Sequence, residues 1–577
     1  MRNPFRRYRA SREIQPDEIF LDSSNLPAHD SFQFEGKVER PVPRRSVVIV
    51  GVFFALVSVL FVFRALQLQI REGRAFAEIS RENVLESSIV FAPRGIIFDR
   101  TGRELAWNEL PTPTASASTS PQFPLRKYST APGLSHVVGW VRYPKEDASG
   151  VWWREDTSGM SGVELSYEPL LAGKNGSTMV ETDARGSVQR ENIVSPPYAG
   201  KDLHLSIDGG VQSKLYQVLA GHAGDMGFVG GAAVIMDVET GEILALTSFP
   251  EYNNQDFTDG DSTSIRSASH DPKTPLLDRA IQGMYAPGSI VKPIFAAAAL
   301  NEGIITPDTT IVSTGAITLQ NPYDKNKPSL FRDWAVHGPI DMRLALAVSS
   351  DEYFYSIGGG YDGQQGLGID RIDKYARLFG LGEPSKIALR GEETGVIPTP
   401  EWKAKIFGTD DPWRIGDTYH TAIGQYGFQV TPIQAVRYIA AIANGGKLLV
   451  PQLLLSSTAQ FSLIDIPDTY LGVVRDGMRL AVTSNRSDAT VKALNIAGIK
   501  IAAKTGTAQI GTHNQYMNSW SVGFWPAPSE VEGPAVKPRY AYAVVLEKAP
   551  AGTASGAAPG LVPFFEWLIA SHPEYIQ

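Results

Sequence analysis

The sequence contains no cysteine among its 577 residues. This absence excludes disulfide bonds, thiolate metal sites and a cysteine nucleophile. It leaves the compartment open, because a large domain can be stable outside the cytoplasm without disulfides. The nine histidines are scattered and show neither HExxH nor a comparable ligand spacing. The sequence therefore predicts no metal centre and no cofactor.

The chain also has no excess of positive charge. Its 53 lysines and arginines are outnumbered by 61 aspartates and glutamates, which gives a formal net charge of −8 and a pI near 5.7. A nucleic-acid binder usually carries a basic surface, so no nucleic-acid partner is predicted. The composition, with 43% hydrophobic residues, is that of a folded protein. Its length favours roughly three to five structural units.

Charged residues are missing altogether from the 18-residue stretch Ser46–Phe63. As a helix it would be about 27 Å long, close to the thickness of a hydrocarbon core. A buried core helix would show one polar face, which this stretch lacks. A cleaved signal peptide would have a shorter apolar run followed by an A-x-A-like site, whereas RALQLQIREG follows here. We therefore expect an uncleaved transmembrane helix over 46–66.

Basic residues flank this predicted helix unequally. The N-terminal side carries Arg2, Arg6, Arg7, Arg9, Arg12, Lys37, Arg40, Arg44 and Arg45. The C-terminal side carries Arg64, Arg71, Arg74 and Arg81. Because basic flanks are retained in the cytoplasm, this bias predicts a cytoplasmic N-terminus and about 510 residues on the outer side of the cytoplasmic membrane. Residues 1–45 lack apolar periodicity and are expected to form a disordered tail.

The region from the predicted membrane helix to about Lys201 is irregular, with many Pro, Ser and Gly residues. Within it, FAPRGIIFDRTGRELAWN (91–108) predicts a strand over GIIF, a turn at DRTG and a second strand over RELAW. Arg94, Asp99 and Arg100 of this segment are each interpreted as solvated turn residues.

The region from about Asp202 alternates strand and helix patterns. Residues 230–249 predict a hairpin, and helices are predicted over 289–303 and 431–446. Strand-like runs follow at 499–510, 518–527 and 539–548. Two early strands, intervening helices and three late strands indicate an α+β fold in which one antiparallel sheet packs on helices.

YAPGSIVKP (285–293) places Ser289 and Lys292 three residues apart at the start of a predicted helix. This spacing brings both side chains to one face, where an amine can accept the proton of a hydroxyl nucleophile. The positive end of the helix dipole favours a neutral amine and stabilises negative charge near Ser289. Lys292 is the only lysine with a serine three positions before it. The alternative is that Ser289 is an N-cap and Lys292 a solvated side chain.

Two further short motifs follow in order. Ser349-Ser350-Asp351 precedes an aromatic run in AVSSDEYFY. Lys504-Thr505-Gly506-Thr507 interrupts the otherwise apolar stretch 499–510. In this second motif a cation and a hydroxyl stand beside a glycine that has no side chain to block approach, which suits the binding of a carboxylate.

Ser-x-x-Lys, Ser-x-Asn/Asp and Lys-Thr-Gly in this order resemble the signature set of penicillin-binding proteins and serine β-lactamases. RGIIFDRTGRELA, MDVETGEILALTSFPEYN and LDRAIQGMYAPGSIVKP resemble class B penicillin-binding proteins in their pedestal, first hairpin and approach to the nucleophile. SSDEYFY, EETGVIPTPEWK, WRIGDTYHTAIGQYGFQVTPIQ and KTGTAQ are similar to the elongation branch of that family. The resemblance covers the membrane helix and nearly everything from about Val84 onward.

This resemblance implies a domain order. The expected parts are a cytoplasmic tail (1–45), a transmembrane helix (46–66), an irregular β-rich pedestal or dimerisation-like domain (67–201) and a transpeptidase domain (202–577). The last is expected to contain a five-stranded antiparallel sheet packed on helices. Localisation in the cytoplasmic membrane, with the catalytic domain outside the cytoplasm, follows from the same resemblance.

The resemblance also implies roles for the motif residues. Ser289 would attack the D-Ala–D-Ala carbonyl of a peptidoglycan stem peptide, with Lys292 as general base. Ser349 would bridge Lys292 and Lys504 and pass a proton toward the leaving D-alanine. The substrate-binding residues would be Asp351, Thr505, Gly506 and Thr507, with Lys504 and Thr505 holding the terminal carboxylate. The backbone N–H groups of Ser289 and Thr507 would form the oxyanion hole.

Asp351 departs from the asparagine that many relatives carry at the third position of the middle motif. An ionised carboxylate only accepts hydrogen bonds, so it cannot donate one to a substrate carbonyl as an amide can. The elongation branch tends to carry Asp there, which leaves the substrate contact at this position open. Some relatives bind zinc near this site, and because this chain has no cysteine we do not carry that metal over.

Other functions share parts of the pattern. A secreted β-lactamase would be about half this length and lack the pedestal, and a β-lactam sensor would need more membrane spans. A D,D-carboxypeptidase uses the same residues with water as acceptor, a division-type transpeptidase is a second enzymatic alternative, and a catalytically idle scaffold is a third possibility. The resemblance implies stem peptides as substrates, β-lactams as inhibitors, and a polytopic glycan polymerase and a scaffold protein of the rod complex as partners.

Overall fold

The computed structural model describes residues 43–74, 85–110, 123–182, 188–321, 326–455, 458–528 and 536–576. The chain divides into two compact units, Met1–Glu86 with Glu181–Gln189 and Ser87–Val180 with Arg190–Gln577. The predicted boundaries between tail, membrane helix, pedestal and transpeptidase domain remain predictions. The disorder expected for the tail concerns residues that lie, up to residue 42, outside the described part.

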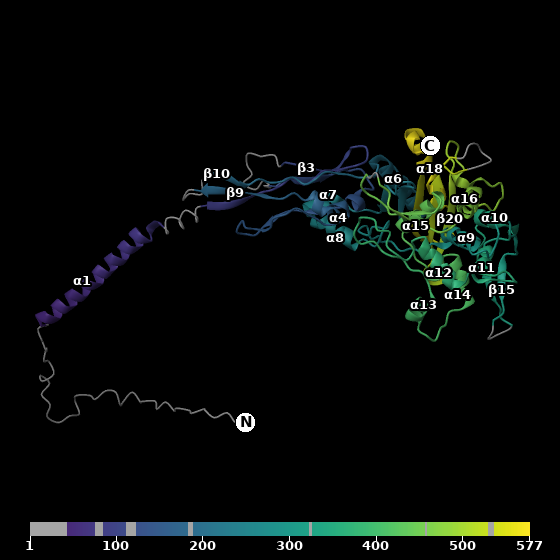
Figure 1. Ribbon diagram of the computed structural model, residues 1–577, viewed down its shortest axis with the longest axis horizontal. Coiled ribbons are helices and arrows are strands. Elements are labelled where there is room, and N and C mark those ends of the chain that lie inside the picture. Colours follow the sequence, from purple (N-terminus) through teal and green to yellow (C-terminus); the bar gives the residue numbers. More distant parts are fainter. Residues whose placement is uncertain are drawn as a thin grey trace, which may run out of the picture. The chain divides into compact units, whose positions relative to one another are not determined.

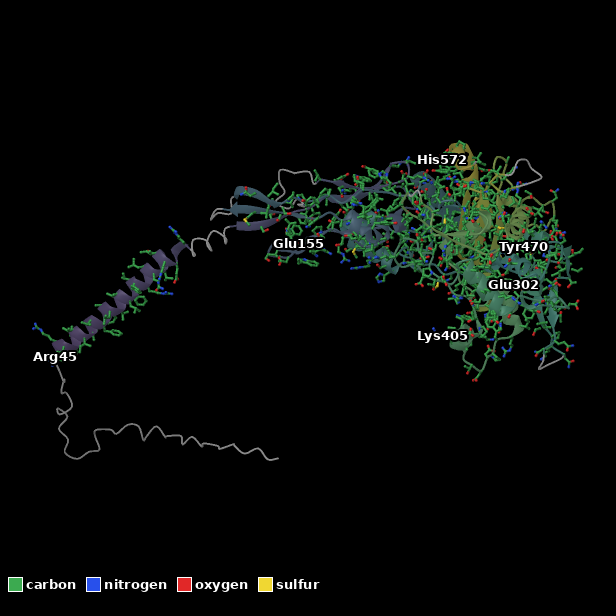
Figure 2. All side chains as sticks on the ribbon, in the orientation of Figure 1. Arg45, Glu155, Glu302, Lys405, Tyr470 and His572 are labelled. Atoms are coloured by element: carbon green, nitrogen blue, oxygen red, sulfur yellow. The ribbon has the colours of Figure 1, made fainter. Side chains whose placement is uncertain are left out.

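The apolar stretch forms helix α1 (Arg44–Leu66), which is followed by a π-helical segment, Gln67–Arg71. None of the residues of α1 is buried, and Figure 2 shows side chains projecting from the whole length of this helix, where Arg45 is labelled. In the described ranges, α1 with its π-helical extension is the one helix long and apolar enough to cross a membrane. This confirms the predicted membrane-spanning candidate.

The pedestal region is built from short elements. Its strands are β1 (Leu85–Val90), β2 (Ile97–Phe98), β3 (Glu104–Glu109), β4 (Leu125–Tyr128), β5 (Val141–Arg142), β6 (Lys145–Glu146), β7 (Trp152–Arg154), β8 (Ser158–Gly159), β9 (Gly176–Thr182), β10 (Val188–Ser195) and β11 (Leu203–His204). Its helices are α3 (Ser135–Val138), α4 (Gly162–Ser166) and α5 (Glu168–Leu171). The predicted strand–turn–strand appears as β2 and β3, which pair antiparallel, and β11 extends their sheet in parallel beside β2.

The interpretation of Arg94 and Asp99 as solvated turn residues is wrong, because both side chains are buried. Arg94 is buried and donates from Nε to Glu164 Oε2 at 2.6 Å. Arg126 donates to the other oxygen of Glu164 at 2.7 Å, so one fully buried carboxylate joins two buried guanidinium groups. Burial alone would raise the pKa of Glu164, but the charges of Arg126 and Arg94 hold it below its ordinary value. Asp99 is buried as well and accepts from the N–H groups of the turn that it begins.

A five-stranded antiparallel sheet lies at the centre of the region that follows. In spatial order its strands are β13 (Ile243–Phe249), β12 (Gly230–Asp237), β22 (Tyr540–Pro550), β21 (Tyr516–Trp525) and β20 (Ala502–Ile510). This sheet confirms the predicted hairpin, the three late strands and the α+β class. Because β20 is an edge strand, one of its sides remains free for another chain.

Helices cover both faces of this sheet. Alternate residues of a strand point to opposite faces, and Val234 lies in the core with α15 (Pro432–Ala443) whereas Ile235 lies in the core with α6 (Gly209–Met226). All residues of β12, β13 and α15 are buried, which explains why these segments consist mostly of apolar residues. The helix predicted for 431–446 is thereby confirmed as α15.

Further helices pack around these layers. They are α7 (Asn254–Asp259), α8 (Ser262–His270), α9 (Lys292–Asn301), α10 (Met342–Val348), α11 (Asp351–Gly359), α12 (Gly368–Leu378), α13 (Pro400–Phe407), α14 (Ile415–Ala422), α16 (Asp468–Thr483), α17 (Ala557–Gly560) and α18 (Val562–Ser571). Short strands complete the fold: β14 (Ile311–Ser313), β15 (Ala316–Leu319), β16 (Ser329–Arg332), β17 (Gly338–Ile340), β18 (Lys447–Leu449) and β19 (Phe461–Leu463). Figure 1 shows α9, α11, α12 and α14 gathered beside the hairpin that contains β15.

Replacing Glu164 with Gln is expected to destabilise the protein by about 3–5 kcal/mol, because two buried guanidinium groups would lose the carboxylate between them. Thermal unfolding of the detergent-solubilised chain should show a midpoint lower by about 5 °C or more. Glu155→Gln is the matched control, since this glutamate is exposed. Equal midpoints for the two variants would contradict the assignment of this ion cluster as a structural core.

Candidate active site

Ser289 lies in a tight 3-10 turn, Gly288–Val291, that directly precedes α9. The sequence predicted an α-helix from Ser289, so the helix begins three residues later than expected. Side chains from distant segments hold this turn. Trp520 Nε1 donates to Ala286 O at 3.0 Å, and Tyr438 Oη donates to Ile290 O at 2.6 Å. The sequence gives no local signal for either contact.

Lys292 is fully buried and contacts the middle motif. Its Nζ donates to Asp351 Oδ1 at 2.6 Å and to Ser349 O at 2.7 Å, and it lies over the ring of Phe354. The alternative of a solvated lysine is therefore wrong. In the described chain, Ser289 Oγ has no hydrogen bond, including none to Lys292. The structure thus brings Lys292 to Ser349 and Asp351, and leaves the Ser289 hydroxyl open to the pocket.

Ser349 stands between the two lysines, as the resemblance implies. It is the residue that directly follows α10, and its backbone lies in the left-handed region, with φ 59°. Lys504 Nζ donates to Ser349 Oγ at 2.6 Å, and Lys292 Nζ lies 3.4 Å from the same oxygen. The three groups therefore form a continuous path along which a proton can move.

The pKa of Lys504 is strongly perturbed. Burial, followed by the positive charge of Lys292, holds the pKa of Lys504 well below its ordinary 10.5, against a smaller opposing effect of Asp351. A depressed lysine pKa favours the neutral amine, which can accept a proton as well as donate one. Thr505, which follows Lys504 on the edge strand β20, and Thr507 line the same pocket as Ser289.

Gly506 packs closely against the nucleophile turn. A Cβ at this position would lie 2.6 Å from Pro287 O and 2.9 Å from Ile290 Cγ2. The missing side chain therefore lets the edge strand β20 contact the nucleophile turn, and the predicted contribution of this glycine to ligand approach stays a prediction. Gly424 is constrained in the same way, because a Cβ there would lie 2.2 Å from Gly288 O. Three chain segments meet at this turn through glycine.

Asp333 is a site residue that the sequence analysis missed. Its Oδ2 accepts from Ser350 Oγ at 2.6 Å and from Glu352 N at 3.0 Å, so it caps the N-terminus of α11. Ser350 in turn accepts from Tyr353 N at 3.2 Å. These bonds fix the helix start that carries Asp351. Asp333 is distant in sequence from both partners, so only the fold reveals its contribution.

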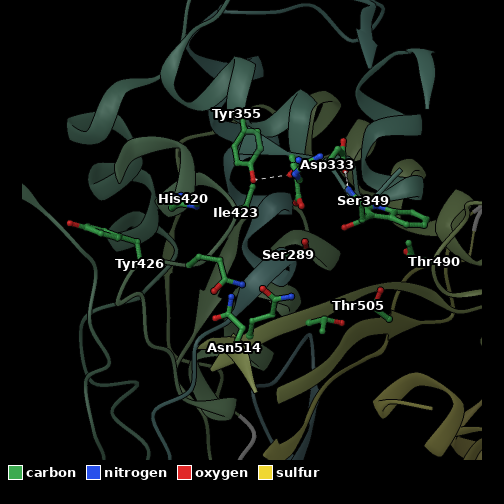
Figure 3. A pocket seen from close by; sticks show the side chains of 16 residues that line it. Ser289, Asp333, Ser349, Tyr355, His420, Ile423, Tyr426, Thr490, Thr505 and Asn514 are labelled. Atoms are coloured by element: carbon green, nitrogen blue, oxygen red, sulfur yellow. Dashed lines mark hydrogen bonds between the residues drawn. The ribbon is translucent and has the colours of Figure 1, made fainter. Parts of the chain in front are cut away.

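A cavity of about 870 Å³ opens at Ser289. Figure 3 shows Ser289 near its centre, with Tyr355 and Asp333 on one side and Thr505 and Asn514 on the other. Its wall also includes Arg332, Trp334, Ser349, Asp351, His420 and Thr507. Of the residues that the structure describes, none form a group of three or more His, Cys, Asp or Glu side chains arranged to hold a metal ion. The groups available here are hydroxyl, carboxylate, guanidinium and imidazole groups, with the amines of Lys292 and Lys504 behind Ser349.

Comparison with known families agrees with this arrangement of residues. Residues 231–562, more than half of the chain, match the penicillin-binding protein transpeptidase domain. The chain belongs to the penicillin-binding protein transpeptidase family. Residues 112–205 match the penicillin-binding protein dimerisation domain, so this member has the two-domain composition of the class B proteins.

Individual relatives indicate which penicillin-binding proteins this chain resembles. It is 34% identical over 460 residues to peptidoglycan D,D-transpeptidase MrdA of Escherichia coli, covering 75% of this chain and 69% of the relative. Its fold resembles PBP2 of Helicobacter pylori, solved in complex with MreC, with a TM-score of 0.68, 26% identity, and coverage of 85% of this chain and 100% of the other. A peptidoglycan synthase complex that coordinates polymerization and crosslinking contains a chain with a TM-score of 0.67, 27% identity, and coverage of 91% and 98%.

Gly506→Ala is expected to displace β20 from the nucleophile turn, because the new methyl group would overlap backbone that cannot move aside cheaply. Overpacking of this kind costs about 1–3 kcal/mol. The thermal midpoint should fall, and covalent labelling by a fluorescent penicillin should slow at least about 10-fold. Gly221→Ala is the control, since a Cβ there meets nothing within 4 Å. Wild-type labelling by Gly506→Ala would contradict this explanation.

Proposed function

We propose that this penicillin-binding protein is a serine-type peptidoglycan D,D-transpeptidase of the elongation type, which crosslinks stem peptides through a Ser289 acyl-enzyme. The observation that carries the proposal is that Ser289 and Ser349 line one cavity, and that Ser349 Oγ contacts the amines of Lys292 and Lys504 buried behind it. The similarity to MrdA supports the elongation branch over the division-type alternative. Water as the acceptor, as in a D,D-carboxypeptidase, is not favoured by these relatives.

In the first step, the Ser289 oxygen attacks the carbonyl carbon of the penultimate D-alanine of a donor stem peptide. The peptide bond to the terminal D-alanine breaks, and the donor remains as an ester on Ser289. Lys292 first passes a proton through Ser349 to the neutral amine of Lys504, and then takes the hydroxyl proton of Ser289 as general base. Ser349 afterwards conveys a proton to the leaving amine. Lys504 and Thr505 hold the terminal carboxylate, and the N–H groups of Ser289 and Thr507 stabilise the oxyanion.

The hydrogen bonds of Lys292 limit how it exchanges protons. An ammonium group has three N–H donors. The carbonyl oxygen of Ser349 and the carboxylate of Asp351 accept two of these hydrogen bonds. Neither acceptor carries a proton of its own that it could donate to Lys292, whereas a hydroxyl group does. The third position is the one left for exchange with the hydroxyl of Ser289 or Ser349. Asp351 thus acts on the reaction by holding Lys292, and its predicted contact with substrate stays a prediction.

In the second step, the amine of another stem peptide attacks the ester carbon. A new amide bond forms, the bond to Ser289 breaks, and the proton lost by the amine returns the serine to its hydroxyl form. β-Lactams acylate the same serine as substrate mimics, which makes them inhibitors. No metal or cofactor takes part in either step of this proposal.

The membrane arrangement is part of the proposal. Helix α1 anchors the protein in the cytoplasmic membrane, with the N-terminus in the cytoplasm and the catalytic domain on the outer side. The uneven basic flanks and the extracytoplasmic location of peptidoglycan support this orientation. We further propose a polytopic glycan polymerase and a scaffold protein of the rod complex as partners, supported by the assemblies of its structural relatives. Pull-down of neither protein with the full chain would contradict the proposed partners.

Ser289→Ala is expected to abolish covalent labelling of the detergent-solubilised chain by a fluorescent penicillin, because no other group forms the acyl ester. Lys292→Met should slow labelling by at least about 100-fold, the contribution expected of a general base. Wild-type protein that fails to label, or a Ser289→Ala variant that labels normally, would refute the proposed mechanism. Thermal unfolding of both variants checks that they are folded.

The absence of native cysteine offers a direct test of orientation. Ser149→Cys, at an exposed turn of the pedestal, is expected to react with a membrane-impermeant maleimide applied to the outer side of the cytoplasmic membrane in spheroplasts. Ser23→Cys should react only after the membrane is permeabilised. The reverse pattern would contradict a cytoplasmic N-terminus.

A further inference from the structure

The guanidinium group of Arg332 lines the Ser289 cavity without a partner. Arg332 is exposed, and in the described part of the chain it forms no ion pair and its side chain donates no hydrogen bond. An arginine presents five N–H donors in a planar fork that matches a carboxylate. A free guanidinium group beside a reacting serine is therefore a ready site for an anionic group.

The backbone of Arg332 is fixed, so its side chain starts from a defined point. Arg332 ends β16 and pairs with Ala316 of β15. Its carbonyl accepts from Tyr355 Oη at 3.4 Å, and the next N–H, that of Asp333, donates to Gly315 O at 2.9 Å. Tyr355 belongs to α11, the helix that begins at Asp351. The backbone of Arg332 is thus hydrogen-bonded to α11, which also carries Asp351.

The acidic groups of the cavity wall do not neutralise Arg332. Asp333 uses its oxygens on Ser350 Oγ and on the N–H groups of Glu352 and Trp334. Asp351 is paired with Lys292. Burial lowers the pKa of His420 below 6.5, against the effects of Asp417 and Asp351, so His420 adds no charge near neutral pH. The Arg332 guanidinium group is left without a bound acidic partner among the described residues of this wall.

The location of Arg332 distinguishes it from the carboxylate site of the donor. Under the proposed function, the donor's terminal carboxylate lies at Lys504 and Thr505, on β20. Arg332 belongs to the opposite wall, with Asp333 and Tyr355, and Figure 3 shows these two residues across Ser289 from Thr505. Trp334 adds a half-exposed aromatic surface there, its Nε1 held by Val348 O at 3.0 Å. This wall is free for the second substrate.

We infer that Arg332 binds a carboxylate of the acceptor, so that the enzyme selects amines that carry a carboxylate beside the attacking nitrogen. This inference rests on the proposed transpeptidase function. It assigns the acceptor class as an amine on a carbon that also bears a carboxylate, as in a free D-amino acid or a diamino acid side chain. The guanidinium group would align the amine with the Ser289 ester and leave the chemistry of acylation to the lysines.

The test compares two acceptors that differ only in this carboxylate. The detergent-solubilised full chain receives diacetyl-L-lysyl-D-alanyl-D-alanine as donor, and either D-methionine or D-methioninamide as acceptor. The ratio of amide product to hydrolysis product is measured for wild type, Arg332→Gln, Arg332→Lys and Arg371→Gln. Arg371 is the matched control. It is a half-exposed arginine of α12, outside the cavity, and it forms an ion pair with Glu302.

We expect Arg332→Gln to lower transfer to D-methionine by about 10- to 100-fold relative to transfer to D-methioninamide, the range of a charge-assisted bidentate contact. Arg332→Lys should keep part of the preference, and Arg371→Gln should keep all of it. An equal loss with both acceptors, or no change with D-methionine, would overturn the inference.

Two further outcomes separate the possible failures. Loss of penicillin labelling in Arg332→Gln would place this arginine on the donor side and overturn the acceptor assignment. The acceptor assignment would also be overturned if the dependence on Arg332 arose from a carboxylate added to the lysyl side chain of the donor rather than to the acceptor. Wild-type protein that does not label with penicillin would instead refute the proposed function itself.

Discussion

The active site depends on two buried lysines, Lys292 and Lys504, that lie close together. One carboxylate, that of Asp351, pairs with Lys292 and lines the cavity. Lys292 and Lys504 are both fully buried, and both reach the hydroxyl of Ser349. Two ammonium groups cannot share such a place cheaply, because each loses its hydration and repels the other. The ion pair of Lys292 with Asp351 and the depressed pKa of Lys504 are the result. One amine keeps an ionic partner and the other tends to be neutral.

Bringing these groups together requires three backbone segments to approach more closely than side chains allow. Gly288, Gly424 and Gly506 meet at the nucleophile turn, and a Cβ on Gly424 or Gly506 would overlap backbone of the neighbouring segment. The sheet supplies Lys504, the helical layer supplies Ser349, and the turn supplies Ser289. Tyr438 and Trp520 then hold the carbonyl groups on either side of the nucleophile. Close packing and proton transfer are therefore two consequences of one arrangement.

Much of this could be predicted from the sequence, and the limits have physical causes. The five-stranded sheet and α15 were predictable because β12, β13 and α15 are buried along their whole length and are rich in apolar residues. The motif residues were found because Ser-x-x-Lys and Lys-Thr-Gly are short local patterns. Asp333 escaped because its bonding partners lie on another segment of the chain, and Arg332 escaped because no local pattern marks its place on the cavity wall. The turn at Ser289 was taken for an α-helix, since 3-10 and α-helical turns share the same i, i+3 spacing.

The carboxylate of Asp351 also explains why this site needs a firmly held helix start. An asparagine at this position would leave the Lys292 ammonium group without a counter-charge, whereas an aspartate supplies one only if its own charge is kept in place. Asp333 does this indirectly, by bonding Ser350 and the N–H of Glu352 at the start of α11. The positive end of that helix further favours an ionised residue in its first turn. The anionic side chain at the middle motif is thus stabilised by the helix that presents it, and it in turn holds the Lys292 amine beside Ser349.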